Sequence, residues 1–141
     1  MLQTVLAFDF GRRRIGVAVG QSITGSASPI GVVDNYTTGP DFEKVAALIA
    51  EWRPGVLVVG MPAHADGSPS DMQNYVRQFI ELLEQFELPV ATVDERFTSI
   101  EAEAKLTDAR VAGARGRISK ESIDSAAAVL IAERYLAAHR N

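Results

Sequence analysis

Short hydrophobic runs, separated by polar or glycine-containing turns, dominate the first third of the chain. The runs are Val5–Phe8, Ile15–Gly20 and Pro29–Val33. Their lengths and their Val, Ile and Phe content are typical of β-strands, and the connections between them are too short for a parallel crossover. We therefore expect an antiparallel meander of three strands, the first of which leads into Asp9.

Beyond residue 40 the hydrophobic period changes to that of amphipathic helices, which alternate with two further strands. Apolar residues recur at helical spacing from Phe42 to Trp52, with Pro40 suited to the first turn, and again from Met72 to Leu83. The two strands and the remaining elements are expected as follows: strands Val56–Val59 and Pro89–Val93, a helix from Thr98 to about Ala109, a loop over 110–118, and a last helix from Ser119 to about Ala138.

This order predicts one α/β domain over residues 1–141, with a five-stranded mixed sheet flanked by helices. Right-handed crossovers place the fourth and fifth strands parallel to the first, and the second strand antiparallel to its neighbours, in the order 3-2-1-4-5. Sheets of this kind gather their chemistry beyond the carboxyl ends of the parallel strands.

Acidic residues occupy positions that suit such a site. Asp9 and Glu95 follow the first and fifth strands, and one intervening strand, ending in Gly60, would set their backbones roughly 10 Å apart. Asp124 shares one helical stripe with Ala127, Ala128, Ile131 and Tyr135, where an acid is costly to bury unless it is paired or binds a cation. Carboxylates without histidine or cysteine suit Mg²⁺ or Mn²⁺, and two such ions lie about 4 Å apart in nucleases.

Each acid also has a simpler interpretation. Asp9 could form the turn before Gly11, Glu95 could be a surface acid paired with Arg96, and Asp124 could favour its helix dipole. The argument for a metal site therefore depends on the three acids meeting at one edge of the sheet.

The distribution of basic side chains along the chain bears on nucleic-acid binding, because these side chains are concentrated in two clusters. The chain has 14 Lys and Arg against 18 Asp and Glu, a net charge of −4, and a uniformly acidic protein binds nucleic acid poorly. Two basic clusters nevertheless flank the acids: three consecutive arginines at 12–14, and Arg110, Arg115 and Arg117 in the loop before the last helix. They could be solvated loops, but their position favours phosphate binding.

Composition excludes other classes. With no cysteine, the chain has no disulfide, zinc–thiolate site or thiol nucleophile. No apolar run approaches the ~20 residues of a membrane span, and the first residues lack the pattern of a signal peptide, so we expect a cytoplasmic protein.

Five spaced motifs carry a family resemblance. They are DFGRRRIGVAV from Asp9, VVGMP from Val58, DGS from Asp66, DERFTSIEA from Asp94 and IDSAAA from Ile123. In this order they cover essentially the whole chain, and together they resemble the YqgF family, also called RuvX or Holliday junction resolvases. Any one motif alone is weak; the set is specific.

The resemblance implies an RNase H-like fold and a cytoplasmic nuclease. The family was linked to Holliday junctions by likeness to RuvC, and later to processing of the 5′ end of pre-16S ribosomal RNA. Its acidic positions fall here on Asp9, Glu95 and Asp124. Many RNase H-like relatives have an acid where this chain has Gly60. The site would then depend on Glu95, with Asp94 alternating to the other side of a regular strand.

We therefore hypothesise two-metal hydrolysis of phosphodiesters in nucleic acid, structured RNA being favoured over branched DNA. Asp9 would bridge two Mg²⁺ or Mn²⁺ ions, supported by Glu95 and Asp124, in a monomer or weak homodimer. The predicted phosphate-binding residues are Arg12, Arg13, Arg14, Arg96, Arg115 and Arg117. Two rivals are an actin-like ATP-dependent phosphotransferase, which needs two such domains, and a non-catalytic nucleic-acid-binding module.

Overall fold

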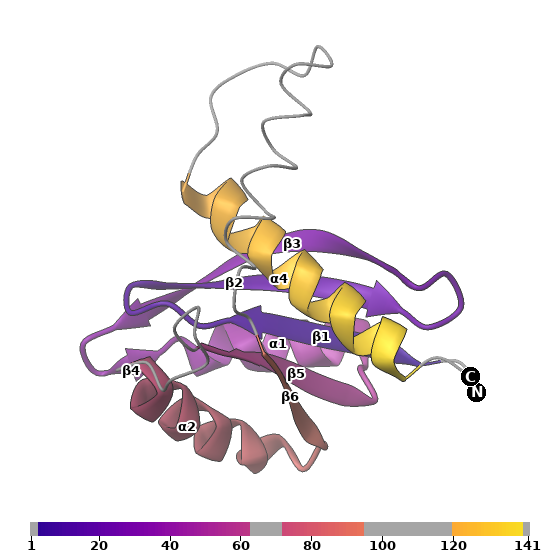
Figure 1. Cartoon of the computed structure of the whole chain (residues 1–141). Coiled ribbons are helices and arrows are strands. Elements are labelled where there is room, and N and C mark those ends of the chain that lie inside the picture. Colours follow the sequence, from indigo (N-terminus) through magenta and orange to yellow (C-terminus); the bar gives the residue numbers. More distant parts are fainter. Residues whose placement is uncertain (1–2, 63–71, 95–119, 140–141) are drawn as a thin grey trace.

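The computed structural model describes residues 3–62, 72–94 and 120–139, and over 120–124 it describes the backbone. Its helices and strands follow one another along the chain in an α/β order (Figure 1). They are β1 Thr4–Asp9, β2 Arg14–Gln21, β3 Ser26–Tyr36, β4 Gly39–Pro40, α1 Phe42–Trp52, β5 Val56–Met61, α2 Met72–Leu83, the 3₁₀ turn η1 Glu84–Phe86, β6 Val90–Asp94 and α4 Lys120–Ala138.

The strands form one mixed sheet in the order β4-β3-β2-β1-β5-β6. β1 pairs with β2 antiparallel and with β5 parallel, and β5 pairs with β6 parallel. The predicted order of the five longer strands and their directions are therefore confirmed. The helix expected at 98–109 and the loop at 110–118 lie outside the described residues.

The predicted number of strands was wrong, because the sheet has a sixth strand at its edge. In β4, Gly39 and Pro40 pair with Tyr36 and Asn35 of β3, and two residues are too few to show an alternating pattern. Pro40 therefore belongs to a strand and not to the first turn of α1. That helix is capped instead by Asp41, whose side chain accepts a hydrogen bond from the Lys44 backbone N–H.

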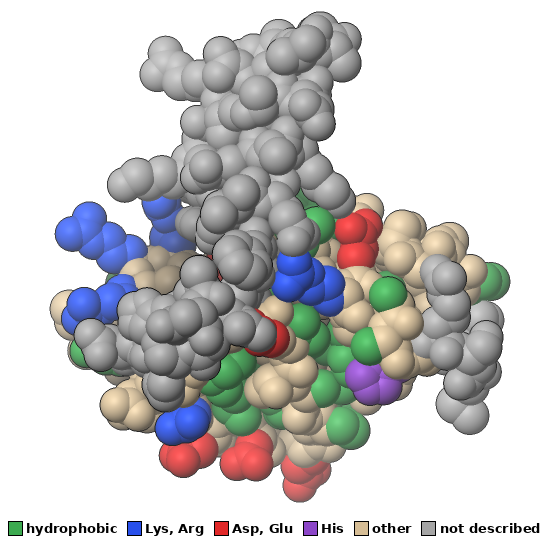
Figure 2. All heavy atoms as spheres, in the orientation of Figure 1, with side chains coloured by type: hydrophobic (Ala, Val, Ile, Leu, Met, Phe, Trp, Pro, Cys, Tyr) green, Lys and Arg blue, Asp and Glu red, His purple; other side chains and the backbone are tan. Residues whose placement is uncertain are grey.

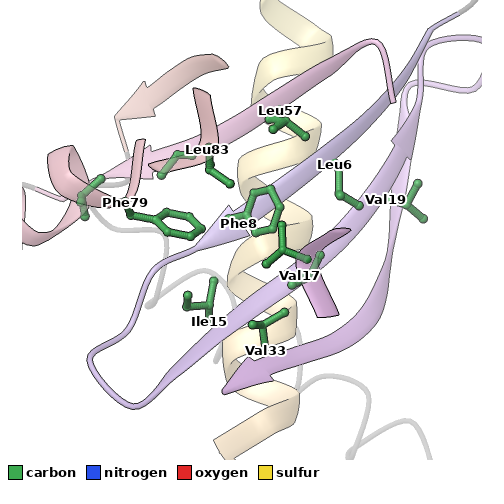
Figure 3. Close-up of a cluster of buried hydrophobic side chains, with 12 residues drawn as sticks. Leu6, Phe8, Ile15, Val17, Val19, Val33, Leu57, Phe79 and Leu83 are labelled. Atoms are coloured by element: carbon green, nitrogen blue, oxygen red, sulfur yellow. The ribbon is translucent and has the colours of Figure 1, made fainter. Parts of the chain in front are cut away.

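The sheet separates two hydrophobic clusters because side chains alternate between its faces. Leu6 and Phe8 of β1 point toward α1 and α2, where they join Phe79 in the larger cluster (Figure 3). Val5 and Ala7 point the other way and pack under α4. Burying each large apolar side chain here stabilises the fold by roughly 1.5–3 kcal/mol, so the central strand is fixed from both sides.

Helix α4 crosses the second face close to the sheet, because small residues meet there. A Cβ placed on Gly20 of β2 would lie 3.0 Å from the Leu136 side chain and 3.0 Å from that of Val5. Ala128 and Ala132 of α4 are fully buried at this contact. No helix in the described part of the chain is long and apolar enough to span a membrane.

Candidate functional site

Asp9 is the last residue of β1, and alternation assigns it a side of the sheet. It pairs with Gly16 of β2, and its carboxylate follows Val5 and Ala7 onto the face that α4 covers. The residue is half-buried. Asp9 therefore stands where the central parallel strand ends, as the sequence predicts, and faces the last helix.

The beginning of α4 lies toward this same end of the sheet. Ser125 donates a hydrogen bond from its hydroxyl to the Gly31 carbonyl, 3.0 Å away. Gly31 pairs with Val17 of β2, which in turn pairs with Phe8, the neighbour of Asp9. At the other end of the helix, Leu136 lies near Gly20 and Val5. Helix α4 thus runs antiparallel to β1, as Figure 1 shows.

This direction places the Asp124 backbone, one residue before Ser125, toward the end of the sheet where Asp9 lies. The stripe predicted to continue from it is buried at Ala127, Ala128, Ile131 and Tyr135, and the last two of these pack with Val5 and Ala7 of β1 in one cluster. The Asp124 side chain lies outside the described part of the structure, so its role as a ligand stays a prediction.

The end of β6 carries the next acids. Ala91 and Val93 pack on the α4 face, whereas Val90 packs on the opposite one. Asp94 consequently falls on the face away from Asp9, and its backbone carbonyl accepts a hydrogen bond from Arg134 Nη1 at 3.1 Å. Glu95 lies outside the described residues, so the choice of Glu95 over Asp94 as a ligand stays a prediction.

Strand β5 lies between β1 and β6, and Gly60 pairs with Val93. Gly60 is itself buried and adds no side chain on the face that α4 covers.

A complete metal site is not seen among the described residues, where no group of three or more His, Asp or Glu comes together. Of the three predicted ligands, Asp9 is the one whose side chain is described. The three predicted carboxylates would fit Mg²⁺ or Mn²⁺ by their chemistry, since carboxylate oxygen is the ligand that these ions prefer.

The turn after Asp9 presents its arginines in a fixed conformation. Asn35 of β3 donates from its side-chain amide to the Gly11 carbonyl at 2.8 Å, and from its backbone N–H to the Arg13 carbonyl at 2.9 Å. A Cβ on Gly11 would lie 2.3 Å from the Arg14 carbonyl oxygen, so the turn requires glycine. Arg14 begins β2 opposite Asp34.

Arg12 is further held by a tyrosine that the sequence pattern did not single out. Its guanidinium lies over the ring of Tyr75 in α2, 4.9 Å from the centroid, and its Nη2 donates to the Tyr75 hydroxyl at 3.4 Å. Such a stack on an aromatic face stabilises an arginine by roughly 0.5–1 kcal/mol at an exposed site. The other predicted phosphate ligands, Arg96, Arg115 and Arg117, lie outside the described residues.

Known proteins resemble this chain along almost its whole length. The family model described as "RuvX: Holliday junction resolvase" matches residues 3–138. A protein of Burkholderia lata named "Putative pre-16S rRNA nuclease" is 48% identical over 134 residues, which cover 94% of this chain and 88% of that protein. One of the same name from Burkholderia cenocepacia is 46% identical over the same shares.

Two solved structures share the fold. RuvC of Thermus thermophilus in complex with a Holliday junction substrate superposes with a TM-score of 0.55 at 18% identity, over 96% of this chain and 94% of that one. Fowlpox virus resolvase with Holliday junction DNA has a TM-score of 0.55 at 12% identity, over 96% and 97%. At this identity they confirm the RNase H-like fold alone. The match over residues 3–138 and the close relatives settle the family: this chain belongs to the RuvX family of Holliday junction resolvases.

Proposed function

We propose that this protein is an endonuclease that hydrolyses phosphodiester bonds with Mg²⁺ or Mn²⁺, and that it processes the 5′ end of pre-16S ribosomal RNA. The observation that carries the proposal is the position of Asp9. Its carboxylate ends the central parallel strand, and alternation turns it to the face covered by α4, whose first turns carry Asp124. The relatives named for pre-16S rRNA support the choice of substrate.

In this proposal Asp9, Glu95 and Asp124 would hold the divalent ions. When bound, the ions would supply an activated water and a charge that stabilises the leaving oxygen. Asp9 needs no rearrangement to take part, because its strand is paired on both sides and its neighbours Ala7 and Phe8 are buried. The protein's own contribution is thus a carboxylate held in place before the substrate arrives.

Arginines near Asp9 would offset the overall negative charge. Figure 2 shows Lys and Arg side chains gathered at the left end of the molecule, where β1 finishes in Figure 1. The described cations there include those at 12–14, in the turn that follows Asp9. They would bind phosphates of the backbone, which contributes affinity more than sequence choice. We expect Arg96, Arg115 and Arg117 to act in the same way.

Cleavage of branched DNA is the second candidate. The description of the family as Holliday junction resolvase favours it, and fold and charge fit both polymers. A symmetric junction would require two active sites and hence a dimer, whereas a monomer or weak homodimer suffices for RNA. A non-catalytic binding module remains the third reading, and we expect any of these to act in the cytoplasm.

The decisive experiment compares precursor 16S rRNA and four-way DNA junctions as substrates, with Mg²⁺, with Mn²⁺ and with chelator. Native protein is compared with Asp9→Asn and with a control, Glu51→Gln, which makes the same carboxylate-to-amide change at an exposed position of α1. We expect metal-dependent cleavage by native protein and by the control, and no cleavage by Asp9→Asn. The circular dichroism spectrum of Asp9→Asn should match that of native protein, which would show that the variant is folded.

The outcomes separate the three candidates. Preferential cleavage of the RNA supports the proposal, and preferential cleavage of the junction supports the resolvase. Binding without metal-stimulated cleavage indicates the non-catalytic module, and undiminished cleavage by Asp9→Asn would remove Asp9 from the site.

A further inference from the structure

A cavity of about 580 Å³ opens on the other side of the turn that follows Asp9. Three segments enclose it: the β1–β2 turn with Arg12 and Arg13, the β3–β4 hairpin with Tyr36, and α2 with Tyr75 and Phe79. Cavities of this size commonly hold small ligands. Neither tyrosine has a part in the proposed metal site.

The cavity combines exposed aromatic rings with fixed positive charge. Tyr36 is 56% exposed and Tyr75 is 42% exposed, although aromatic side chains usually bury most of their surface. Among the lining residues the charged ones are Arg12 and Arg13. Rings on which a base can stack, beside cations that can meet its phosphate, are the combination by which proteins bind unpaired nucleotides.

Charge is distributed unequally between the two ends of the cavity. Arg12 and Arg13 stand at the β1–β2 turn, whereas Asp34 and Asp41 lie near the hairpin end, where the Tyr36 hydroxyl contacts the Asp34 carboxylate at 3.5 Å. The carboxylate of Asp34, more than any other influence, raises the pKa of Tyr36. A phosphate is attracted to the two arginines, which leaves the aromatic rings beside them for an uncharged base.

The walls of the cavity are already in place. Asn35 ties the β1–β2 turn to the hairpin strand, and Arg12 rests on Tyr75. The floor is Phe79, which packs edge-on against Phe8 at 5.5 Å between ring centroids. A ligand that enters a preformed site avoids most of the cost of ordering its surroundings.

The cavity also lies close to the proposed catalytic position. Arg12 follows Asp9 by three residues, so the two backbones are separated by no more than about 11 Å. A strand bound with one phosphate at Asp9 could therefore pass around the end of the sheet and place a neighbouring nucleotide in the cavity.

We propose that this cavity binds one unpaired nucleotide of the substrate strand, with its base against Tyr36 and Tyr75 and its phosphate against Arg12 and Arg13. This inference rests on the proposed nuclease function and adds a requirement to it. The enzyme selects strands that have an unpaired nucleotide beside the bond to be cut.

The test measures equilibrium binding of a labelled single-stranded RNA oligonucleotide, and of the same sequence in a duplex, in chelator so that no cleavage occurs. The variants are Tyr36→Ala and Tyr75→Ala, with Tyr36→Phe and Tyr75→Phe as ring-preserving partners. Ile23→Ala serves as control, because Ile23 is 70% exposed in the turn between β2 and β3, outside the lining of the cavity.

We expect each alanine variant to bind the single strand about 5- to 150-fold more weakly, the range that loss of one base stack produces. The phenylalanine variants and the control should bind like native protein, and duplex affinity should change little. Native-like single-strand binding by both alanine variants would overturn the proposal, as would equal weakening for single strand and duplex.

These results are independent of the Asp9→Asn experiment, which reads metal-dependent cleavage. If the cavity does not bind a nucleotide, native protein should still cleave its substrate. A failure of the nuclease proposal appears as absent or Asp9-independent cleavage, whatever the oligonucleotide affinity.

Discussion

The hydrogen bond from Ser125 to Gly31 is the one described polar contact that fixes the beginning of α4 against the sheet. It joins residues 94 positions apart in the chain, and the Ser125 side chain is 6% exposed. The β-strand register shifts between Val17 and Ala18, opposite Gly31, whose φ is +127°. The irregularity offers the Gly31 carbonyl to the helix, and replacing Ser125 with alanine would remove its donor.

The expected cost can be worked out from burial. A net hydrogen bond contributes about 0.5–1.5 kcal/mol, and leaving a buried partner unsatisfied costs about 1–3 kcal/mol. Gly31 is half-buried, so water can replace part of the lost contact, and we expect Ser125→Ala to lower the free energy of unfolding by about 1–2 kcal/mol. That corresponds to roughly a 5- to 30-fold change in the ratio of folded to unfolded protein.

The assay is urea unfolding followed by the fluorescence of Trp52, the chain's one tryptophan, which packs beside the larger core cluster. The matched control is Ser22→Ala. The exposed Ser22 hydroxyl accepts a hydrogen bond from the Gln3 backbone N–H at 2.7 Å, and its removal should change the free energy of unfolding by no more than about 0.5 kcal/mol. The slope against urea should not change, because both variants expose the same surface on unfolding.

Catalysis supplies a second measurement. Because Asp124 directly precedes Ser125, loosening this contact should lower kcat, by up to about 100-fold, and leave KM nearly unchanged at temperatures where the variant is folded. If Ser125→Ala loses no more stability than Ser22→Ala, or retains native kcat, the idea that this bond positions the start of α4 is refuted.

Two further predictions concern the core and the cavity. Phe79 is 1% exposed and contacts Phe8 and Phe10, so Phe79→Ala should lower the free energy of unfolding in urea by about 3–5 kcal/mol. Phe86→Ala, at a partly buried position of the same cluster, should lower it clearly less. Equal losses for the two variants would contradict this account. Asp34→Asn should lower the pKa of Tyr36 toward its usual value, seen as a tyrosinate absorbance titration corrected with Tyr36→Phe. In native protein the raised pKa means that stability falls as the pH rises above about 10, where the unfolded chain ionises first, and an unshifted titration in Asp34→Asn would rule out the carboxylate as the cause.

Much of the fold follows from hydrophobic pattern because the central strands are buried on both faces. Val5–Phe8 and Val56–Val59 are continuous apolar runs, and both are central strands of the sheet. The last helix begins at Lys120, one residue from its predicted start. β4 could not be predicted, because two residues at the sheet edge are held by their pairing with β3 and not by a pattern of their own.

The position of Asp9 at the end of the central strand could be predicted, because a β-strand fixes the side to which each residue points. The structure adds that Asp94 falls on the face away from Asp9, whereas the ligand set of Asp9, Glu95 and Asp124 stays a prediction. The stacking of Arg12 on Tyr75 could not be predicted from the sequence, because it joins residues 63 positions apart. Tyr75 lies in a helix whose apolar stripe looks, from sequence alone, like core.

The two faces of the sheet explain why one short turn can serve both proposed sites. Asp9 ends β1 pointing to the face of α4, and the chain then reverses through Gly11 and delivers Arg12 to the face of α2. Because Asn35 holds this reversal, the spacing between carboxylate and arginine is set by the fold and not by loop motion. A substrate that must satisfy both at once has to bend around the end of the sheet. In the proposed function an unpaired strand would do so at little cost, whereas a continuous stiff duplex would not. We therefore expect the two proposed sites to favour structured RNA with an unpaired segment, or the crossover of a branched DNA, over uniform duplex.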